Sequence, residues 1–597
     1  MSVTPRGMSV QEAYREYRDG NFRVNRRYQR KLVWTLNEKR KLIDSLLHGY
    51  PIPLFLFAVS GRPNGKRAYE IVDGMQRLNA IFDFIENSYD LNGRYFDVDQ
   101  LSRAKQLAAQ NVFDVKATAG NILHAKECAD LLDYQLAVTE FPGANEESVN
   151  DIFGRINAFG RHLSDQERRQ AGVGTMFATT VRELAAQLRG DESMEVLDLA
   201  SMPKISIDVD GDHESYGIAA NDTFWCKQGI LRKSQLRESE DEQLIADLLV
   251  SILDEQAFAF SGKNLDIIYD PESSESKRLN DLLASYGTER VKSEVAATIS
   301  IIKSCIESID PEPNALRRVV HPTSNTNPIK TAFYAVFMAF FDLCVRRKKA
   351  PANSKAILRS LHDLQSKLHV SAGAVRSEPR QQNVDLTRGL IQKHFEPAQP
   401  PIISRGAGTI IRFENAIRRS KVETSTFECK QGLLALDDKR KPAPGLLEKI
   451  VETVCAIANT AVIGPDGFTG ALFVGVADKD ADVRRIENLD GVQAHRVGSR
   501  YCVGVDRELV HLGIDMEAYK RRIVSHISSS NLSQPLKTAV LSNVDCITYK
   551  GLSVICIWIP TQRAVSAVDD VVYVREDSNN KKVEGLTQTQ AVMSLFR

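Results

Sequence analysis

The chain contains 597 residues, a length that at roughly 100–200 residues per domain suggests about three or four domains. Hydrophobic residues make up 43% and charged residues 26% of the sequence, which is ordinary for a globular protein and excludes global disorder. The 77 Lys and Arg residues balance 77 Asp and Glu residues, so the formal net charge is zero. This balance excludes a bulk polycation such as a histone. It does not exclude local basic patches, because net charge sums over faces that differ.

The cysteines and the start of the chain indicate the compartment. The nine cysteines form no C-x-x-C pair, which argues against zinc ribbons and thioredoxin-type motifs, and their odd number and irregular spacing fit reduced thiols. The N-terminal segment lacks the apolar core of a secretory signal. The apolar run Phe333–Phe341 is far shorter than the ~20 residues that cross a bilayer. We therefore expect a cytoplasmic protein that makes no membrane contact.

Residues 1–160 alternate strand and helix patterns, which predicts an α/β domain. Apolar spacing predicts a helix at 36–49, and short apolar runs predict strands at 52–59 and 68–72. Another helix should begin at Asp73–Gly74, directly after the second strand. Such junctions often bind phosphate, because backbone N–H groups without helical partners point outward there. An isolated Asp-Gly in this place is otherwise a helix cap.

Residues 161–395 are expected to form a mainly α-helical middle domain, and residues 410–597 a second α/β domain. Helices are expected at 244–260, 293–309 and 331–346, with a strand at 205–209. Prolines and glycines with little periodicity mark a linker at 396–409. The fold class is therefore multidomain α+β. In the last third, the patterns predict a helix at 446–460 and strands at 426–430, 470–478, 539–549, 552–560 and 571–576.

Residues 21–41 contain eight Lys or Arg and one acid, interleaved with Tyr28 and Trp34. Such a segment could contact phosphates or bases, and it could equally be the solvated edge of a strand. Three ordered blocks include or follow it: RRYQRKLVW before a helix and GYPIPLFLF, then YEIVDGMQRLNAI, and later FGRINAFGRHLSDQE at 153–167. Together they resemble the ParB/sulfiredoxin-like nucleotidase domain at the front of GmrSD-type restriction enzymes.

This resemblance implies that residues 1–160 bind and hydrolyse a nucleoside triphosphate and thereby control a linked nuclease. By its motif position, Asp73 would hold Mg²⁺ or position the attacking water, since carboxylate oxygens suit that cation. Met75 departs from the family, which has a Gln there, and the departure bears on hydrolysis more than on binding. The nucleotide-binding residues that the resemblance implies are Gln29, Arg30, Asp73, Gly74, Gln76, Arg77, Arg155 and Asn157.

A second constellation of charged residues lies in the C-terminal third. Glu428 and Lys430 are two residues apart on an expected strand and so share a face. Glu423 lies just before them, and Asp478 ends the expected strand 470–478. Carboxylates that converge at strand ends can hold a hard cation, and a neighbouring lysine can stabilise developing phosphate charge. Charge alternation on an exposed strand would give the same E-x-K triplet.

The wider pattern of ETSTFECK, IVETVCAIANT, GALFVGVAD and VVYVREDSNNKK resembles the Schlafen AlbA-like domain. The resemblance implies an RNA-cleaving domain in which Glu423, Glu428 and Asp478 hold Mg²⁺ or Mn²⁺, with Lys430 as a further catalytic residue. Many bacterial members are instead described as DNA-binding regulators, and the segment 461–470 is longer here than the family's turn. Contacts to the nucleic-acid backbone are expected from Arg418, Arg419, Arg575 and Ser578.

The two resemblances together imply an anti-phage defence protein of restriction or abortive-infection type. Its NTP-binding front domain would control a metal-dependent nuclease that acts on DNA or RNA. The alternatives are a nucleotide-responsive DNA-binding regulator without cleavage, and a structural subunit whose partner supplies the nuclease. A homo-oligomer is compatible with the sequence. Basic segments at 21–41 and 405–441 predict that any binding to nucleic acid weakens steeply with salt.

Overall fold

The computed structural model divides the chain into two compact units. The first comprises Met1–Asp191, Glu195–Val295 and Ile302–Pro397, and the second consists mainly of Ala398–Arg597. The first unit therefore contains both the N-terminal α/β region and the helical region, and each unit is described by itself. The residues that the structure describes are 4–26, 31–61, 67–110, 112–118, 120–142, 149, 152, 164–170, 173–191, 196–202, 204–206, 217–323, 326–369, 376–398, 407–420, 424–462, 467–576 and 578–596.

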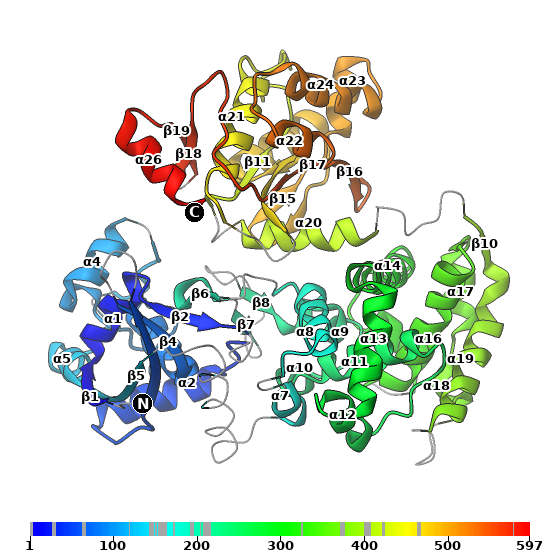
Figure 1. The fold of residues 1–597 in the computed structure, drawn as a ribbon, viewed down its shortest axis with the longest axis horizontal. Coiled ribbons are helices and arrows are strands. Elements are labelled where there is room, and N and C mark those ends of the chain that lie inside the picture. Colours follow the sequence, from blue (N-terminus) through cyan, green and yellow to red (C-terminus); the bar gives the residue numbers. More distant parts are fainter. Residues whose placement is uncertain are drawn as a thin grey trace. The chain divides into compact units, whose positions relative to one another are not determined.

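A six-stranded mixed sheet forms the centre of the N-terminal region (Figure 1). β3 pairs with one neighbour in parallel and with the other antiparallel, and Leu56 on β3 lies opposite Asp73 on β4. The end of β4 therefore meets the beginning of β3 at one edge of the sheet. In order across the sheet, the strands are β1 (Thr4–Ser9), β5 (Gln135–Pro142), β3 (Phe55–Gly61), β4 (Arg67–Asp73), β2 (Phe22–Asn25) and β6 (Val196–Asp198).

Helices bury the main apolar core against one face of this sheet. The central one is α3 (Met75–Ile85), in which every residue from Arg77 to Ile85 is buried. α2 (Leu36–Leu47) confirms the helix expected at 36–49 and starts at a capping box formed by Thr35 and Glu38. The other described helices of this region are α1 (Val10–Arg18), η1 (Val98–Gln100), α4 (Ser102–Ala109) and α5 (Ala125–Asp133).

The rest of the first unit is mainly helical, as expected from the sequence. Its short strands are β7 (Lys204–Ser206), β8 (Gly217–Ala219), β9 (Lys349–Pro351) and β10 (Phe395–Pro397). Its α-helices are α7 (Asp165–Gln170), α8 (Met176–Arg189), α9 (Phe224–Lys227), α10 (Lys233–Arg237), α11 (Glu240–Leu253), α12 (Gly262–Tyr269), α13 (Ser274–Tyr286), α14 (Thr288–Glu307), α15 (Ala315–Val320), α16 (Lys330–Phe341), α17 (Ser354–Ser360), α18 (Leu364–Lys367) and α19 (Ser377–Ile391). The remaining short helical turns are η2 (Leu199–Ser201), η3 (Ala220–Asp222), η4 (Asp342–Arg346) and η6 (Gln392–His394).

A buried ion pair ties α11 to α19 in this helical region. Nη2 of Arg380 donates to Oδ2 of Asp247 at 2.5 Å, and Nη1 donates to the carbonyl of Phe258 at 3.1 Å. The guanidinium carbon of Arg380 also lies 3.8 Å from the ring centre of Tyr334 on α16. Burial raises the pKa of Asp247 to about 6, although Arg380 opposes that change. The stability of this region should therefore depend on pH.

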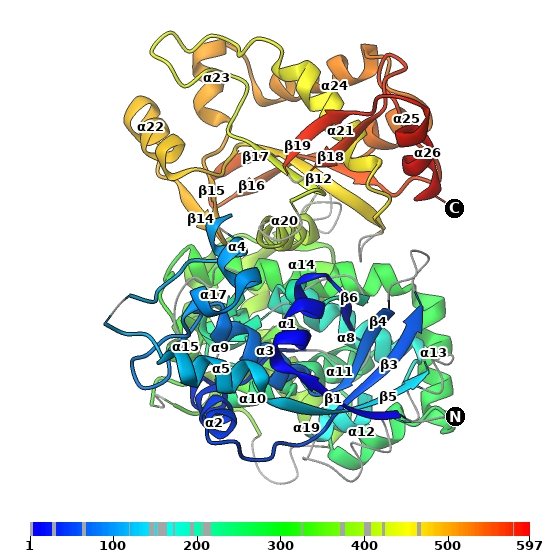
Figure 2. The ribbon, with the colours of Figure 1, turned by 90° about the vertical axis from the view of Figure 1, so that its left-hand side faces the viewer.

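The second unit is an α/β/α arrangement around a four-stranded sheet in the order β11-β12-β17-β16. Helix α20 covers one face, and α21 and α24 cover the other (Figure 2). The strands are β11 (Phe427–Lys430), β12 (Phe468–Val474), β13 (Val476–Ala477), β14 (His495–Val497), β15 (Arg500–Cys502), β16 (Val544–Tyr549), β17 (Leu552–Pro560), β18 (Tyr573–Glu576) and β19 (Asn579–Lys582). The helices are α20 (Ala407–Arg419), α21 (Leu446–Ala458), α22 (Asp480–Asp490), α23 (Asp506–Leu512), α24 (Met516–Ser529), α25 (Leu536–Leu541) and α26 (Leu586–Ser594).

Several expected boundaries are wrong. The strand expected at 470–478 breaks at Gly475, whose φ of 106° is left-handed, so that β13 leaves the central sheet and pairs with β15. The helix expected at 244–260 ends at Leu253, and Glu255 beyond it has a φ of 55°. The first residues of the strand expected at 539–549 belong instead to the end of α25.

Among the described residues, no helix combines the length and apolar character needed to span a membrane. The apolar run that begins at Phe333 instead belongs to α16, where the side chains from Ala332 to Phe341 are buried within the helical region. Its apolar character therefore reflects packing inside the protein.

Candidate functional site

The β4–α3 junction places Asp73 beside the start of a helix. Gly74 has a φ of 103°, and a Cβ at this position would lie 2.2 Å from Cδ1 of Phe55, so both backbone and space require glycine. Asp73 is the last residue of β4 and Gly74 is the residue that caps α3, so the alternative of Asp73 as the helix cap is wrong. Because glycine offers no side-chain acceptor, it leaves the first N–H groups of α3 without a side-chain cap.

Arg77 holds Asp73 in place. Its Nη2 donates to Oδ2 of Asp73 at 2.8 Å, and its Nη1 donates to the carbonyl of Pro53. The guanidinium carbon lies 4.6 Å from the ring centre of Phe55. The side chain of Arg77 is 10% exposed and that of Asp73 is 46% exposed. Asp73 is therefore accessible to a cation or water, whereas a phosphate contact from Arg77 stays a prediction.

Gln76 joins two of the motif blocks. Its Oε1 accepts hydrogen bonds from the backbone N–H groups of Val33 and Trp34, with N···O distances of 3.1 and 3.3 Å. Its Nε2 donates to the carbonyl of Lys31 at 2.5 Å. Both ends of the amide thus bind residues 31–34, the second half of RRYQRKLVW. A phosphate contact from Gln76 stays a prediction, and the geometry gives it a second task, the positioning of this segment.

Lys31 extends from the same segment into the helical region. Its Nζ donates to Oγ of Ser239 at 2.7 Å and to the carbonyl of Leu236 at 3.1 Å, and the residue is 4% exposed. Burial lowers the pKa of Lys31, and the nearby guanidinium of Arg189 lowers it further. Lys31 thereby attaches residues 31–34 to α10 and to the start of α11.

A cluster of buried ion pairs attaches Arg26, the first residue of the RRYQRKLVW block, to the helical region. Arg26 lies 3.0 Å from Asp191, and Arg189 lies 3.1 Å from Asp191 and 2.5 Å from Asp241. The side chains of Arg189, Asp191 and Asp241 are at most 1% exposed. Removing one partner from such a pair would leave a buried charge without compensation, which is strongly destabilising. Both flanks of residues 27–30 are therefore anchored in the helical region.

The third motif block ends in a helix start. Ser164 and Glu167 form a reciprocal capping box at α7, with N···O distances of 3.0 and 3.2 Å, and Oγ of Ser164 also donates to the carbonyl of Glu238 at 2.7 Å. These contacts give the last part of FGRINAFGRHLSDQE an architectural role. Four sequence-predicted residues lie outside the described residues and stay predictions: Gln29, Arg30, Arg155 and Asn157.

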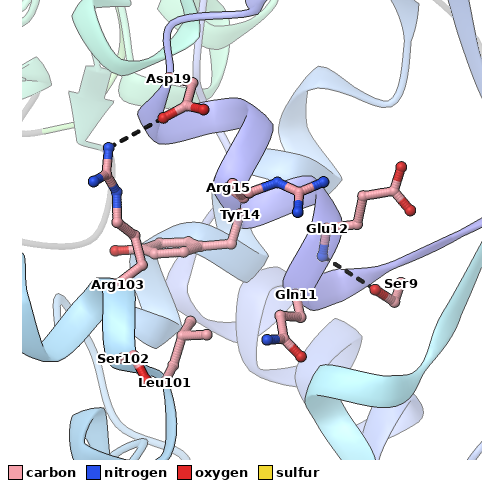
Figure 3. A pocket seen from close by; sticks show the side chains of 9 residues that line it. All are labelled: Ser9, Gln11, Glu12, Tyr14, Arg15, Asp19, Leu101, Ser102 and Arg103. Carbon is pink, nitrogen blue, oxygen red and sulfur yellow. Dashed lines mark hydrogen bonds and ion pairs between the residues drawn. The ribbon is translucent and has the colours of Figure 1, made fainter.

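An open pocket of about 520 Å³ lies between α1 and the beginning of α4 (Figure 3). Arg103 bonds across it to Asp19 at 3.1 Å, and Arg15 lies on its wall. Its described lining contains both acids and bases and none of the residues predicted to bind nucleotide. The pocket is therefore separate from the Asp73 junction. The lining residues are Ser9, Gln11, Glu12, Tyr14, Arg15, Asp19, Leu101, Ser102 and Arg103.

In the second unit, Glu428 lies between two cations. Nζ of Lys430 donates to Oε1 of Glu428 at 2.9 Å, as the two-residue spacing on β11 predicts. Nη2 of Arg575 on β18 donates to Oε2 of Glu428 at 2.9 Å and to the carbonyl of Thr424 at 3.3 Å. The side chain of Arg575 is 2% exposed and that of Glu428 is 16% exposed. Arg575 therefore lies inside the domain, where it orients the carboxylate.

Asn459, in the A-N-T segment, has a structural role. Its Nδ2 donates to the carbonyls of Ser566 and Tyr573, both at 2.8 Å, and its Oδ1 accepts from N of Ser566 at 2.8 Å. Asn459 is 1% exposed. It fastens the end of α21 to the strand that carries Arg575, and so this motif supports the site without taking part in it.

Asp478 directly follows β13 and makes a separate ion pair. Its Oδ2 lies 3.3 Å from Nη1 of Arg500, and Nε of Arg500 donates to Oγ of Ser420 at 3.3 Å. Among the described residues, no three His, Cys, Asp or Glu side chains are arranged so that they could hold a metal ion. Glu423, the third predicted ligand, lies outside the described residues. Both oxygens of Glu428 already accept from cations, and the metal site stays a prediction.

The predicted nucleic-acid contacts occupy different environments. Arg419 is 4% exposed, and its guanidinium carbon lies 5.1 Å from the ring centre of Phe427, so this side chain packs inside the domain. Arg418 is partly exposed and lies against Gly498. Ser578 is exposed in the turn between β18 and β19. Nucleic-acid binding by these residues stays a prediction.

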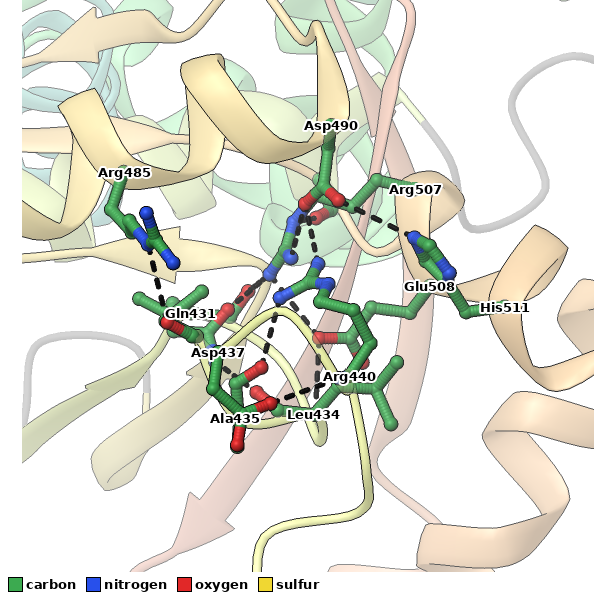
Figure 4. Close-up of polar contacts among 12 residues, drawn as sticks. Gln431, Leu434, Ala435, Asp437, Arg440, Arg485, Asp490, Arg507, Glu508 and His511 are labelled. Carbon is green, nitrogen blue, oxygen red and sulfur yellow. Dashed lines mark hydrogen bonds and ion pairs between the residues drawn. The ribbon is translucent and has the colours of Figure 1, made fainter.

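Sequence reasoning missed a polar network around the residues that follow β11, from Gln431 onward (Figure 4). Arg507 binds both the carbonyl and the side chain of Gln431 and lies 2.9 Å from Asp490, which Arg440 also contacts at 2.5 Å. The carboxylate of Glu508 accepts from three buried donors: the backbone N–H groups of Leu433 and Leu434, which follow β11, and the hydroxyl of Tyr519 on α24. The network fixes the chain directly after Lys430, and no short motif in the sequence marks its members.

Comparison with protein families assigns both α/β regions. Residues 10–173 match the GmrSD restriction endonuclease, N-terminal domain, and residues 423–584 match the Schlafen AlbA_2 family. Both resemblances and their order along the chain are confirmed. No match was found among curated proteins or among solved structures. The two families support a function of the nuclease or defence type, for which nucleic acid is the expected substrate.

Proposed function

We propose that this chain is a cytoplasmic defence nuclease in which an N-terminal ParB-like domain binds and hydrolyses a nucleoside triphosphate and controls cleavage of DNA or RNA by an AlbA-like domain. The observation that carries the proposal is the match of residues 423–584 to the Schlafen family, within which Glu428 and Lys430 lie on one face of β11. A carboxylate beside a lysine on one strand face is a pairing that phosphodiester chemistry uses. Magnesium or manganese belongs to the proposal because the Schlafen resemblance implies it.

The N-terminal part of the proposal rests on Asp73 and the start of α3. A half-exposed carboxylate at the end of a strand can bind a cation, and the neighbouring helix start provides N–H groups and a positive dipole end for phosphate. Gln76 and Lys31 connect this junction to α10 and α11. These contacts would connect a nucleotide bound at Asp73 with the helical region.

A nucleotide-responsive regulator that binds DNA without cutting it is the second candidate. The observation that favours it is that both oxygens of Glu428 already accept hydrogen bonds from cations. In that case Glu428 would have a structural role, and basic side chains of the same unit would contact the phosphates of DNA. Such binding should weaken steeply with salt, since each phosphate contact releases counterions.

Cleavage assays distinguish the two candidates. Purified protein is incubated with each nucleoside triphosphate and with labelled plasmid, phage DNA or total tRNA, in Mg²⁺, in Mn²⁺ or in EDTA. Glu428→Gln should abolish cleavage, whereas Glu576→Gln, an exposed glutamate paired with Lys581, should leave it unchanged. Nucleic-acid binding without cleavage under every condition would exclude the nuclease and favour the regulator.

Nucleotide turnover is measured separately on Asp73→Asn. The proposal expects loss of triphosphate hydrolysis in this variant, with Asp99→Asn as the control, since Asp99 is 63% exposed and pairs only with a surface lysine among the described contacts. Unchanged hydrolysis in Asp73→Asn would remove Asp73 from the catalytic role, while the test of the second unit would stand.

A further inference from the structure

A hydrogen-bonded relay runs behind Glu428 from α21 through the hairpin β18–β19. The hydroxyl of Thr453 on α21 donates to the carbonyl of Lys449 at 2.6 Å, so its oxygen is left as an acceptor. Nδ2 of Asn580 on β19 donates to that oxygen at 2.8 Å. Oδ1 of Asn580 then accepts from Nη1 of Arg575 at 2.8 Å. Each donor meets an acceptor, and the orientation of the amide follows from Arg575, which can only donate and so requires Oδ1 on its side.

The relay supplies one of the hydrogen-bond acceptors of Arg575. The Arg575 side chain is 2% exposed, and a buried guanidinium needs acceptors around it. One of them is Oδ1 of Asn580, and the others are the Thr424 carbonyl and Glu428. If the Asn580 amide turned over, its NH₂ group would face the guanidinium, and two donors would oppose each other. In the observed orientation the NH₂ group faces Thr453, whose oxygen accepts from it while the hydroxyl hydrogen stays on the Lys449 carbonyl.

We infer that Thr453 and Asn580 are positioning residues of the C-terminal site, which orient Arg575 so that Glu428 keeps Oε2 on Arg575 and Oε1 on Lys430. This inference rests on the proposed function of that site. Neither residue is marked by a charged or catalytic pattern in the sequence. Reactive groups need placement within about 0.5 Å, which side chains achieve when other hydrogen bonds hold them.

Three substitutions test the relay in the full-length protein. Thr453→Val removes the hydroxyl at nearly constant volume, Thr453→Ser keeps it, and Asn580→Ala removes the amide. Thr469→Val is the matched control, because Thr469 is fully buried on β12 and its hydroxyl has no hydrogen-bond partner among the described residues. We expect kcat for nucleic-acid cleavage to fall at least tenfold in Thr453→Val and Asn580→Ala. KM should stay within twofold of wild type, and Thr453→Ser and Thr469→Val should stay near the wild-type kcat.

Amide hydrogen exchange of residues 573–582 is recorded on the same proteins, because it reports the relay whether or not the protein cuts nucleic acid. Faster exchange in Thr453→Val but not in Thr453→Ser supports the relay. Equal cleavage and equal exchange in these two variants would overturn the inference. If wild-type protein cuts no substrate, the proposed nuclease function fails, and the exchange result alone then decides whether Thr453 orients the hairpin.

Discussion

Replacing Gly432 by alanine should destabilise the second unit by about 3–6 kcal/mol. A Cβ at this position would lie 1.9 Å from Oε1 and 2.5 Å from Cδ of Glu508, so the carboxylate must move. Glu508 is fully buried and accepts hydrogen bonds from N of Leu433 at 2.8 Å, N of Leu434 at 3.2 Å and the hydroxyl of Tyr519 at 2.7 Å. A hydrogen bond to a charged group contributes about 1.5–3 kcal/mol, and at least two of the three would break.

The change is measured as the free energy of local opening of β17, from amide hydrogen exchange of residues 552–560. Gly389→Ala is the control, because Gly389 lies exposed in α19 with no atom within 4 Å of the added Cβ. That variant should leave β17 unchanged and should raise helix stability locally by up to about 1 kcal/mol. If Gly432→Ala lowered the opening free energy of β17 by less than about 1 kcal/mol, the steric reasoning would be refuted.

Other substitutions probe the first unit. Gly74→Ala should lower the melting temperature in a thermal scan and abolish any nucleotide binding seen by calorimetry, since its Cβ would enter the ring of Phe55 and a φ of 103° is strained for alanine. Asp247→Asn should remove one pH-dependent contribution to the free energy of unfolding. The folded pKa of Asp247, about 6, exceeds its ordinary 3.8, so wild-type stability relative to the variant should fall by about 2 kcal/mol between pH 4 and pH 7 in urea unfolding. Lys31→Met should show the opposite trend. Burial lowers the pKa of Lys31, so wild type should gain stability relative to the variant as pH rises toward 10.5, measured from melting temperatures.

Local periodicity was enough to predict most elements, but not where they end. The helix at 36–49 was found within two residues, because its apolar stripe and the Thr35–Glu38 capping box are both local. The strand at 470–478 was predicted as one piece, since apolar residues continue across Gly475. The break depends on tertiary contacts, in which the Gly475 N–H donates to the carbonyl of Lys430 and its carbonyl accepts from Val503.

Contacts in the candidate sites could be predicted only between residues that are close in the sequence. The pairing of Glu428 with Lys430 follows from the period of a strand, and the structure bears it out. The contact between Glu428 and Arg575 spans 147 residues, so only the family resemblance could suggest that both belong to one site. Asn580 could not be found in this way, because an asparagine near a hairpin turn has no distinctive pattern. For Gln76 the motif predicted a phosphate contact, which stays a prediction, and it gave no sign of the backbone contacts that the amide makes.

Both candidate sites show the same compensation of charge, so a protein of zero net charge can contain the two sites proposed for anionic ligands. Asp73 pairs with Arg77, and Glu428 pairs with Arg575. In each pair the arginine is buried and also binds a backbone carbonyl, so it is held even if the carboxylate leaves. A phosphate that approaches either arginine must compete with a carboxylate already bound there. Because Asp73 is 46% exposed and Glu428 only 16%, the carboxylate of the first site is easier to release or to give to a cation. A ligand should therefore displace the carboxylate of the N-terminal site more easily than that of the C-terminal one, which is what the proposed control by nucleotide would need.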